Sequence, residues 1–273
     1  MEILLAASLW GTTGTVRTFS AIGPIEGGAA KTVLGGVLLT ALAGRRLRAL
    51  LAGGWKTWAL LALGAFCVAD FQLAFFAAVV RTGVATGTVV TIGSAPVFAG
   101  LLAGTRPSPR WIVSTVAAVT GCALLVGGGQ SAGVQPLGVG LALLSGLGYA
   151  SYATIAGRLI RAGADDRAVI AAMFCGAAMV LLPALVLGSL GPMVTVSGAL
   201  VTLYLGVITT AVPYVLYARG LRTTPVPIAT TLGLAEPAVA AVLGLTVLGE
   251  HLAPIALAGV ALLAVALFVL VRR

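Results

Sequence analysis

Long apolar runs separated by short polar segments dominate this chain. A helix needs roughly 17–25 predominantly apolar residues to cross the hydrocarbon core of a bilayer. Ten such runs lie near residues 3–20, 27–43, 57–79, 84–104, 110–127, 137–157, 168–188, 196–218, 226–247 and 252–271. The pattern therefore predicts an all-α membrane protein with ten transmembrane helices.

The composition indicates the same class of protein. Of the 273 residues, 60% are hydrophobic and only 8% are charged, whereas about 25% of the residues of a soluble domain are charged. The net charge of +9 could by itself suggest a nucleic-acid partner. The basic residues are concentrated in the short segments between apolar runs, however, so we expect contact with membrane lipid and none with nucleic acid.

The basic residues also predict how the helices are oriented. If the N-terminus is cytoplasmic, only Arg17, Lys31 and Arg81 of the 16 Lys and Arg residues lie on the outer side. Cytoplasmic loops of membrane proteins carry an excess of Lys and Arg. We therefore expect a multi-pass protein of the inner (plasma) membrane with both termini in the cytoplasm.

The second half of the chain is similar to the first. At a shift of 141 positions, Arg81-Thr82 falls on Arg222-Thr223 and Pro96 falls on Pro237. The expected units are repeat 1 at residues 1–129 and repeat 2 at residues 130–273, integrated in one membrane domain. Since five spans is an odd number, the second repeat would enter the bilayer with opposite orientation. Inverted repeats of this kind are typical of secondary transporters, whose substrate site lies between the repeats.

Two prolines interrupt equivalent spans of the two repeats. Pro96 lies in the fourth span and Pro237 in the ninth. Proline removes a helical hydrogen bond and opens the helix, which a membrane tolerates only beside protein or a water-filled cavity. We expect the two prolines to act as hinges beside a central path. Pro213 in the eighth span is unmatched, because Gln72 occupies the equivalent position.

Two of the seven acidic residues, Asp70 and Glu236, lie near the middle of predicted spans. A charged group at this depth costs roughly 2.5–3.5 kcal/mol, so each is expected to face the interior and to serve in function. Both are candidates for substrate binding and for proton coupling. A structural role stays open for each: Asp70 could pair with Lys31 or with nearby hydroxyls, and Glu236 could form a hydrogen bond beside Pro237.

Aromatic and polar residues within the spans complete the expected substrate site. Trp10 and Tyr149 occupy roughly matching positions in spans one and six, where an inverted repeat would place them across the axis. Aromatic walls suit apolar or aromatic substrate groups, although core packing is the alternative. Lys31 could meet a substrate carboxylate or extend toward the outer surface. The expected substrate-binding residues are Trp10, Thr13, Lys31, Asp70, Gln72, Tyr149, Tyr152, Tyr214, Tyr217 and Glu236.

Enzyme signatures are absent or out of context in the sequence. Gly129-Gln-Ser131-Ala-Gly133 matches the G-x-S-x-G pattern, but it lies in a Gly-rich loop without the strand and helix that a nucleophile elbow needs. The only histidine, His251, and three separated cysteines form no metal-binding pattern. The sequence thus predicts a protein that is not an enzyme and that uses no metal or cofactor.

Several short motifs occur in a particular order along the chain. They are Leu9-Trp10-Gly11 in span one, Thr210-Ala-Val-Pro-Tyr214 in span eight, Glu236-Pro237-Ala-Val-Ala-Ala in span nine and Leu248-Gly249-Glu250 at its end. Together they resemble the drug/metabolite transporter superfamily, in its EamA-type ten-helix branch. At the end of span four the chain has Ala-Gly-Thr-Arg106-Pro-Ser-Pro, where relatives often have Leu-Gly-Glu. The resemblance implies transport of small metabolites, often amino-acid efflux, through a cavity formed by both halves.

These observations predict a secondary transporter of small metabolites, with amino-acid export by alternating access as the expected activity and proton coupling as an added feature. Facilitated diffusion, or transport of drugs, nucleosides or sugars by the same fold, remains the alternative. A membrane-embedded enzyme or scaffold is the remaining class. The expected functional unit is a monomer or a weak homodimer.

Overall fold

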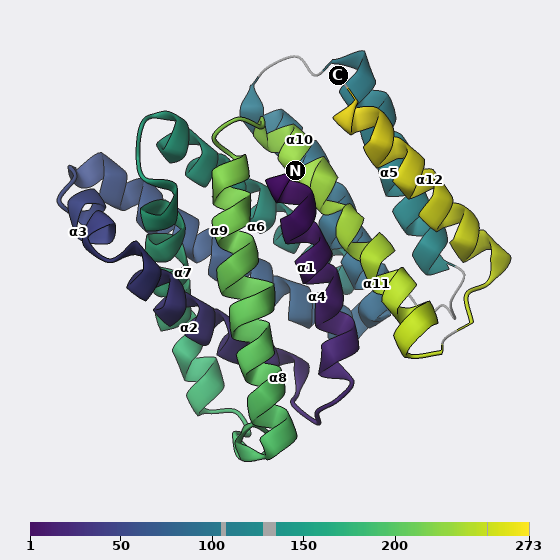
Figure 1. The fold of residues 1–273 in the computed structure, drawn as a ribbon, viewed down its shortest axis with the longest axis horizontal. Coiled ribbons are helices and arrows are strands. Elements are labelled where there is room, and N and C mark those ends of the chain that lie inside the picture. The colour runs from purple at the N-terminus through teal and green to yellow at the C-terminus, as the bar shows by residue number, and fades with distance from the viewer. Residues whose placement is uncertain (105–107, 128–134, 250, 273) are drawn as a thin grey trace.

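The computed structural model describes residues 1–104, 108–127, 135–249 and 251–272, which form helices and, within these ranges, no β-strand (Figure 1). The helices are α1 (Glu2–Arg17), α2 (Pro24–Ala43), α3 (Arg45–Leu51), α4 (Trp55–Ala103), α5 (Pro109–Gly127), α6 (Pro136–Arg161), α7 (Asp166–Val186), η1 (Gly191–Val194), α8 (Val196–Gly206), η2 (Val207–Ala211), α9 (Val212–Gly220), α10 (Val226–Gly233), α11 (Ala235–Val247) and α12 (Pro254–Val271). The expected repeat boundary at residues 129 and 130 lies outside the described residues. The same holds for Arg106, Glu250 and the G-x-S-x-G segment.

The predicted all-α membrane architecture is confirmed. Eight helical segments are long and apolar enough to cross a bilayer: Pro24–Ala43, Trp55–Val84, Thr86–Ala103, Pro136–Arg161, Asp166–Val186, Val196–Gly220, Val226–Val247 and Pro254–Val271. The two other expected spans are shorter helices: α1 has 16 residues, and the apolar part of α5 covers Pro109–Leu125. The count of ten spans therefore stays a prediction at these two helices.

Spans three and four form one element, α4, which bends at a glycine. Gly83 has a φ of 79° and a ψ of 158°, outside the helical region. Only glycine adopts such a positive φ without steric cost, because it has no β-carbon. The two arms of α4 therefore meet directly at Gly83, without a loop between them.

Local sequence explains where several helices begin. Pro24, Pro136 and Pro254 are the first residues of α2, α6 and α12, a position where the missing N–H group and fixed φ of proline suit a helix. The Asp165 side chain accepts hydrogen bonds from the backbone N–H groups of Arg167 and Ala168, each at 3.1 Å. It thereby caps α7.

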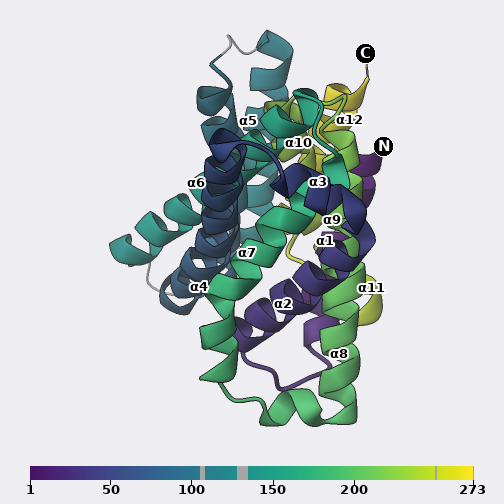
Figure 2. The ribbon, with the colours of Figure 1, turned by 90° about the vertical axis from the view of Figure 1, so that its left-hand side faces the viewer.

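The two halves of the chain pack against each other in equivalent pairs. Helix α2 lies beside α7, and α5 lies beside α12 (Figures 1 and 2). Helix α6 packs against both arms of α4, and α1 packs correspondingly against α9 and α11. Every pair joins a helix of the first half to one of the second. This is the arrangement expected of two structural repeats that enclose a common centre.

Glycines permit the close approach of these pairs. A β-carbon added at Gly121 of α5 would lie 2.8 Å from the backbone oxygen of Gly259 in α12, and one added at Gly36 of α2 would lie 2.9 Å from that of Phe174 in α7. Apolar burial gives little driving force between helices in lipid, so small residues that let backbones touch stabilise the association. The contact between the repeats thus depends on glycine.

Candidate functional site

Aromatic rings from three helices meet at the centre of the molecule. Trp10 of α1 lies 5.1 Å from Tyr214 and 5.4 Å from Tyr217 of α9, measured between ring centroids. Tyr149 of α6 lies 5.4 Å from Tyr152 on the same helix and 6.4 Å from Tyr217. We refer to these five residues as the tyrosine cluster. Because α1 belongs to the first half and α6 and α9 to the second, both halves build it.

Two phenylalanines that the sequence did not single out extend this cluster. The Phe174 ring of α7 lies 4.1 Å from Tyr214, and the Phe71 ring of α4 lies 5.6 Å from Tyr149. Phenylalanine is a common packing residue of apolar spans, so no property of the sequence distinguishes these two from the other six. The only local signal is the position of Phe71 between Asp70 and Gln72.

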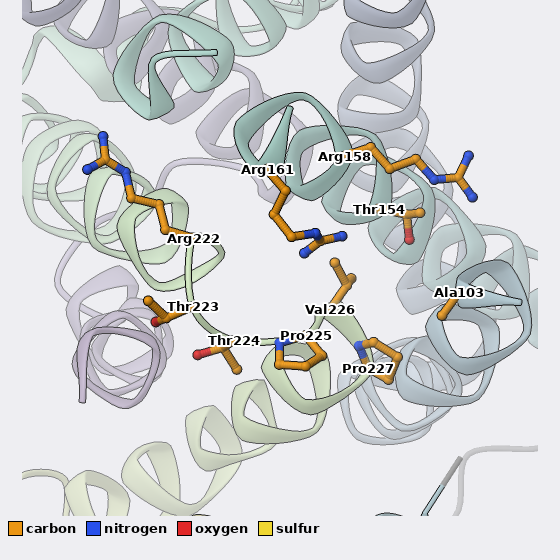
Figure 3. A pocket seen from close by; sticks show the side chains of 10 residues that line it. All are labelled: Ala103, Thr154, Arg158, Arg161, Arg222, Thr223, Thr224, Pro225, Val226 and Pro227. Atoms are coloured by element: carbon orange, nitrogen blue, oxygen red, sulfur yellow. The ribbon is translucent and has the colours of Figure 1, made fainter. Parts of the chain in front are cut away.

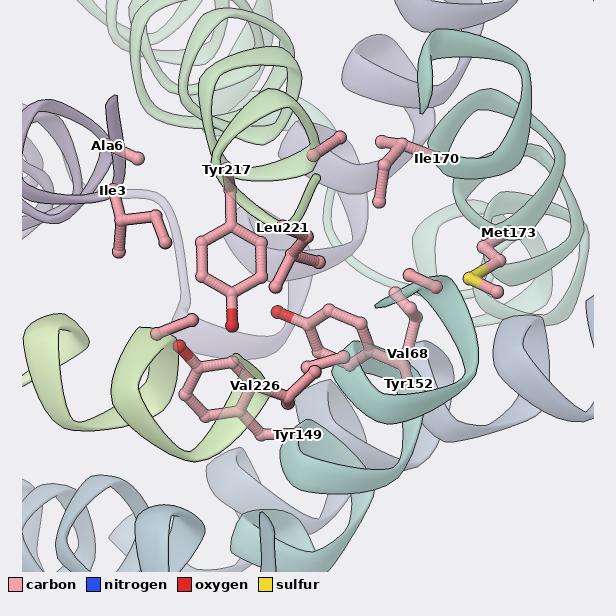
Figure 4. Packing of buried hydrophobic residues seen from close by; sticks show 14 of the residues in the cluster. Ile3, Ala6, Val68, Tyr149, Tyr152, Ile170, Met173, Tyr217, Leu221 and Val226 are labelled. Carbon is pink, nitrogen blue, oxygen red and sulfur yellow. The ribbon is translucent and has the colours of Figure 1, made fainter. Parts of the chain in front are cut away.

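The cluster contains buried polar atoms that the protein does not pair. Within the described part of the chain, the Trp10 Nε1 atom and the hydroxyls of Tyr149 and Tyr217 form no hydrogen bond of normal geometry, although these two hydroxyls lie close to each other. Figure 4 shows the hydroxyls of Tyr149, Tyr152 and Tyr217 pointing toward one another. A buried polar group without a partner costs about 1–3 kcal/mol. These groups are therefore available to the polar atoms of a small molecule.

The ninth span is broken next to this cluster. Helix α10 ends at Gly233, and α11 begins at Ala235. Pro237 explains the break, because it cannot donate a hydrogen bond to the oxygen of Gly233, four residues earlier. A β-carbon added at Gly233 would lie 2.9 Å from the Tyr149 hydroxyl. The helix therefore approaches the Tyr149 hydroxyl closely at Gly233, the last residue of α10.

The break also places Glu236 in the first turn of α11, where the partial positive charge of a helix N-terminus stabilises a carboxylate. Lys31 of α2 is near enough for its charge and that of Glu236 to interact. Among the described residues, however, the two do not form an ion pair. Both side chains are partly exposed. The centre thus carries one acid and one base that are not neutralised by direct contact.

The surroundings of Lys31 show that it faces the space between the two halves. Gly28 and Gly35 lie on the same face of α2 as Lys31, one turn before and one turn after it. Gly28 lies against the Phe76 ring of α4, and Gly35 lies against the Thr210 methyl group of η2. Lys31 therefore lies on α2 between a contact with the first half, at Phe76, and a contact with the second half, at Thr210.

The remaining predicted residues lie in different surroundings. Asp70 contacts Gly148 of α6 and forms no ion pair with Lys31 or any other described residue. Gln72 is buried, and its amide donates to the Thr32 hydroxyl at 3.0 Å, so it joins α4 to α2. Thr13 is half-buried on α1, one turn after Trp10. The structure thus brings the aromatic residues together, with Glu236 at the helix break beside them, Lys31 within charge interaction of Glu236, and Asp70 and Gln72 at neighbouring helix contacts.

A π-helical turn lies in the eighth span, over residues Val207–Ala211. Pro213 follows it and leaves the oxygen of Thr209 without its usual helical donor. The hydroxyls of Thr209 and Thr210 both donate to the Leu205 oxygen at 2.9 Å. Wider turns of this kind occur frequently at functional sites, and this one lies on the contact between α2 and the second half.

The described residues provide no set of metal ligands, since no three His, Cys, Asp or Glu side chains come together among them. Cys67, Cys122 and Cys175 are each free. The chemistry that the centre does offer is aromatic contact, hydroxyl hydrogen bonding and two opposite charges. This combination suits reversible binding of a small organic molecule.

Comparison with known proteins identifies the family. The EamA-like transporter family matches twice, at residues 2–127 and 136–272. The chain is 37% identical over 276 residues to a Bacillus subtilis (strain 168) protein described as "Uncharacterized transporter YwfM", covering 98% of this chain and 92% of that protein. A solved structure described only as "Crystal structure of protein" shares the fold, with a TM-score of 0.83, 18% identity and coverage of 99% of this chain and 95% of that one. The chain therefore belongs to the EamA-like transporter family and is a membrane transporter.

Proposed function

We propose that the protein is a secondary transporter that exports amino acids across the plasma membrane, with both termini in the cytoplasm. Family membership supports transport in general, and the centre of the molecule supports a zwitterionic substrate. Export and amino acids are the activity expected from the resemblance of the sequence motifs. The orientation follows from the distribution of basic residues.

The observation that carries the proposal is the pair of opposite charges beside the tyrosine cluster. Glu236 would accept hydrogen bonds from the ammonium group of an amino acid, and Lys31 would donate to its carboxylate. Charge-assisted hydrogen bonds of this kind are stronger than neutral ones. The rings of Trp10 and Tyr214 would contact the substrate side chain, which favours apolar and aromatic amino acids.

Both halves of the chain contribute residues to the centre of the molecule, which supports alternating access. Trp10 and Lys31 come from the first half of the chain, whereas the tyrosines and Glu236 come from the second. In transporters with inverted repeats, one bundle rocks against the other about a site that lies between them. Such a movement would move the rings apart on one side of the substrate and bring them together on the other side.

Glu236 is also our candidate for proton coupling, with Asp70 as a second one. A carboxyl group that binds either a proton or the substrate ammonium group, but not both, links substrate release to proton uptake. Glu236 suits this role because none of the described basic residues neutralises it by a direct ion pair. Asp70 lies at the contact between α4 and α6, where a change in charge could alter the packing of the two halves.

Flux measurements on purified protein in liposomes test the proposal. We expect accumulation of labelled amino acid to follow a pH gradient in the wild type. Glu236→Gln removes the charge at nearly constant volume and should lower flux at least tenfold and remove its pH dependence. The matched control is Glu26→Gln, which makes the same change at the start of α2 and should leave flux unchanged.

Other outcomes would replace parts of the proposal. Flux that is independent of pH in the wild type indicates facilitated diffusion. Thermal stabilisation by drugs, nucleosides or sugars, but by no amino acid, indicates another substrate class, because a ligand stabilises the state that binds it. Normal, pH-dependent flux in both Glu236→Gln and Asp70→Asn would contradict the assigned role of the acids.

A further inference from the structure

A cavity of about 390 Å³ lies outside the tyrosine cluster, where the end of α6 meets the turn that leads into α10 (Figure 3). It is on the face that the charge distribution predicts to be cytoplasmic. Three arginines line it, Arg158, Arg161 and Arg222. The volume lies within the range of roughly 300–1,000 Å³ that is usual for small-molecule sites.

The three arginines differ in what they bind. Arg158 donates to the Leu102 oxygen at 3.0 Å, and Arg222 forms an ion pair with Asp166 at 3.0 Å. Arg161 forms neither an ion pair nor a side-chain hydrogen bond with the residues that the structure describes. Figure 3 shows its guanidinium group over the middle of the cavity, beside Val226. Arg161 is consequently the cation that a ligand in this cavity would meet.

Gly157, which has no side chain, leaves room for the Arg161 guanidinium group. A β-carbon added at Gly157, one turn before Arg161, would lie 3.2 Å from Arg161 Nη1 and 3.4 Å from Nη2. The guanidinium group therefore folds back over the bare surface of α6 at Gly157. A side chain at residue 157 would meet Val226 Cγ2 first, at 2.8 Å, and would also crowd the Arg161 guanidinium group.

The start of α10 adds to the positive character of the cavity. Pro225, Val226 and Pro227 line it, and none of the described side chains caps this end of the helix. A helix N-terminus carries a partial positive charge. The hydroxyls of Thr223 and Thr224 lie on the same wall and can donate to an anion. The chemistry of the cavity thus suits a carboxylate or a phosphate group.

The cavity shares a wall with the tyrosine cluster. Val226 lines the cavity and is also shown beside Tyr149 and Tyr152 in the packed centre (Figure 4). Thr154 lines the cavity from α6, two residues after Tyr152. A molecule held by Arg161 would therefore be separated from the aromatic rings by little more than the Val226 side chain.

We propose that this cavity is a cytoplasmic entrance site, in which Arg161 holds the carboxylate of the transported molecule before it reaches the tyrosine cluster. The role in entrance rests on the proposed function, whereas carboxylate binding at Arg161 does not. A phosphate group, free or in a lipid headgroup, has related chemistry and is included in the test. The carboxylate is favoured because Val226 lines the cavity and also lies beside the aromatic rings of the tyrosine cluster.

Calorimetric titration of the purified protein tests the site itself. The probes are L-phenylalanine, 3-phenylpropionate, phenethylamine and glycerol 3-phosphate. Arg161→Gln should raise the Kd of the two carboxylates about tenfold, the loss expected for one charge-assisted hydrogen bond, and leave the Kd of phenethylamine unchanged. Arg45→Gln, with the same loss of charge on α3, is the matched control. Gly157→Leu, which crowds both Val226 and the Arg161 guanidinium group, should also raise the Kd of the two carboxylates while keeping the arginine.

Flux in oriented proteoliposomes tests the role in entrance. Arg161→Gln should raise KM for L-phenylalanine supplied at the cytoplasmic face and leave KM at the outer face unchanged. Equal KM values in variant and wild type at both faces, or Arg161-dependent binding of glycerol 3-phosphate alone, would overturn the proposal. Absence of any amino-acid flux in the wild type would contradict the proposed function, but Arg161-dependent carboxylate binding could still be measured.

Discussion

The two repeats contain a proline at equivalent positions, but the proline breaks the helix in only one of them. Helix α4 continues through Pro96 up to Ala103, whereas the span with Pro237 is divided into α10 and α11. The residue four positions earlier, whose oxygen loses its hydrogen bond, is Ile92 in the first case and Gly233 in the second. Glycine has the backbone freedom that lets a helix bend, whereas isoleucine, which carries a β-carbon, does not. The same proline therefore has different consequences in different surroundings.

The difference coincides with a difference in charge. The residue before Pro96 is Ala95, which is fully buried, whereas the residue before Pro237 is Glu236. A continuous helix allows close packing at Ala95. The broken helix presents Glu236 at the N-terminus of α11, where its charge is stabilised. Divergence between the two copies thus lies where the proposed substrate site lies.

Replacement of the prolines tests this comparison and should have the largest effect. Pro237→Ala restores the hydrogen bond to Gly233, so we expect α10 and α11 to join and Glu236 to move away from the centre. Transport should fall at least tenfold, which corresponds to about 1.4 kcal/mol of activation free energy, while Tm stays equal or rises. Initial rates in proteoliposomes and a thermal melt measure both effects.

The matched variant is Pro96→Ala, in which the helix is already continuous. We expect its transport rate to stay within about twofold of the wild type, a difference of about 0.4 kcal/mol. If Pro96→Ala lowers transport as much as Pro237→Ala does, the two prolines act as a symmetric pair of hinges. The asymmetry of the helix break would then have no functional meaning.

Removal of a hydroxyl of the tyrosine cluster should have a smaller effect on substrate binding. Tyr217→Phe removes a buried hydroxyl that has no partner in the described structure, so stability should not fall. Substrate affinity should fall about fivefold, because one hydrogen bond contributes about 1 kcal/mol. Binding is measured by titration, and stability by chemical unfolding.

Tyr204→Phe is the control for that change. The Tyr204 hydroxyl donates to the Thr12 hydroxyl at 3.1 Å, and a bond of this type between membrane helices contributes about 0.6 kcal/mol. We therefore expect the opposite result, a small loss of stability with substrate affinity retained. The same loss of affinity in both variants would show that the cluster hydroxyls have no special role.

The smallest effect is expected at Gln72, the counterpart of Pro213. Gln72→Leu removes the hydrogen bond to Thr32 and should lower the free energy of unfolding by about 0.6 kcal/mol without changing transport. Gln135→Leu is the control, since that side chain makes no capping hydrogen bond at the start of α6. A large loss of transport in Gln72→Leu alone would indicate that the amide binds the substrate directly.

The sequence predicted the class of fold well because membrane spans are a local property. A helix in lipid must satisfy its own backbone and present apolar side chains, so each span can be read without knowledge of its neighbours. The aromatic candidates were also accessible, since Trp10 and the four tyrosines combine polar atoms with positions inside spans. Their meeting in one cluster could not be read from the chain, because it depends on the rotation of α1, α6 and α9.

Asp70 and Glu236 illustrate what sequence could not distinguish. Both are acids near the middle of a span, and the cost of burial makes both candidates. Depth along a helix follows from residue number, but the neighbour that a side chain meets depends on helix packing. Asp70 meets Gly148 of α6, whereas Glu236 lies at a helix break close to Lys31. Phe71 and Phe174 were missed for a related reason, because apolar packing and a substrate wall require the same side chain.

The sequence by itself determined a duplicated, all-helical membrane protein, because apolar runs, basic loops and a repeated register are each encoded over short distances. It also determined the family through motifs of adjacent residues. The tertiary structure alone decided that Pro237 opens its helix while Pro96 does not. Among the described residues, it also decided that the Tyr149 and Tyr217 hydroxyls and the Arg161 guanidinium group have no partner. These features depend on which side chains meet from distant parts of the chain, and only the packing of the two repeats brings them together.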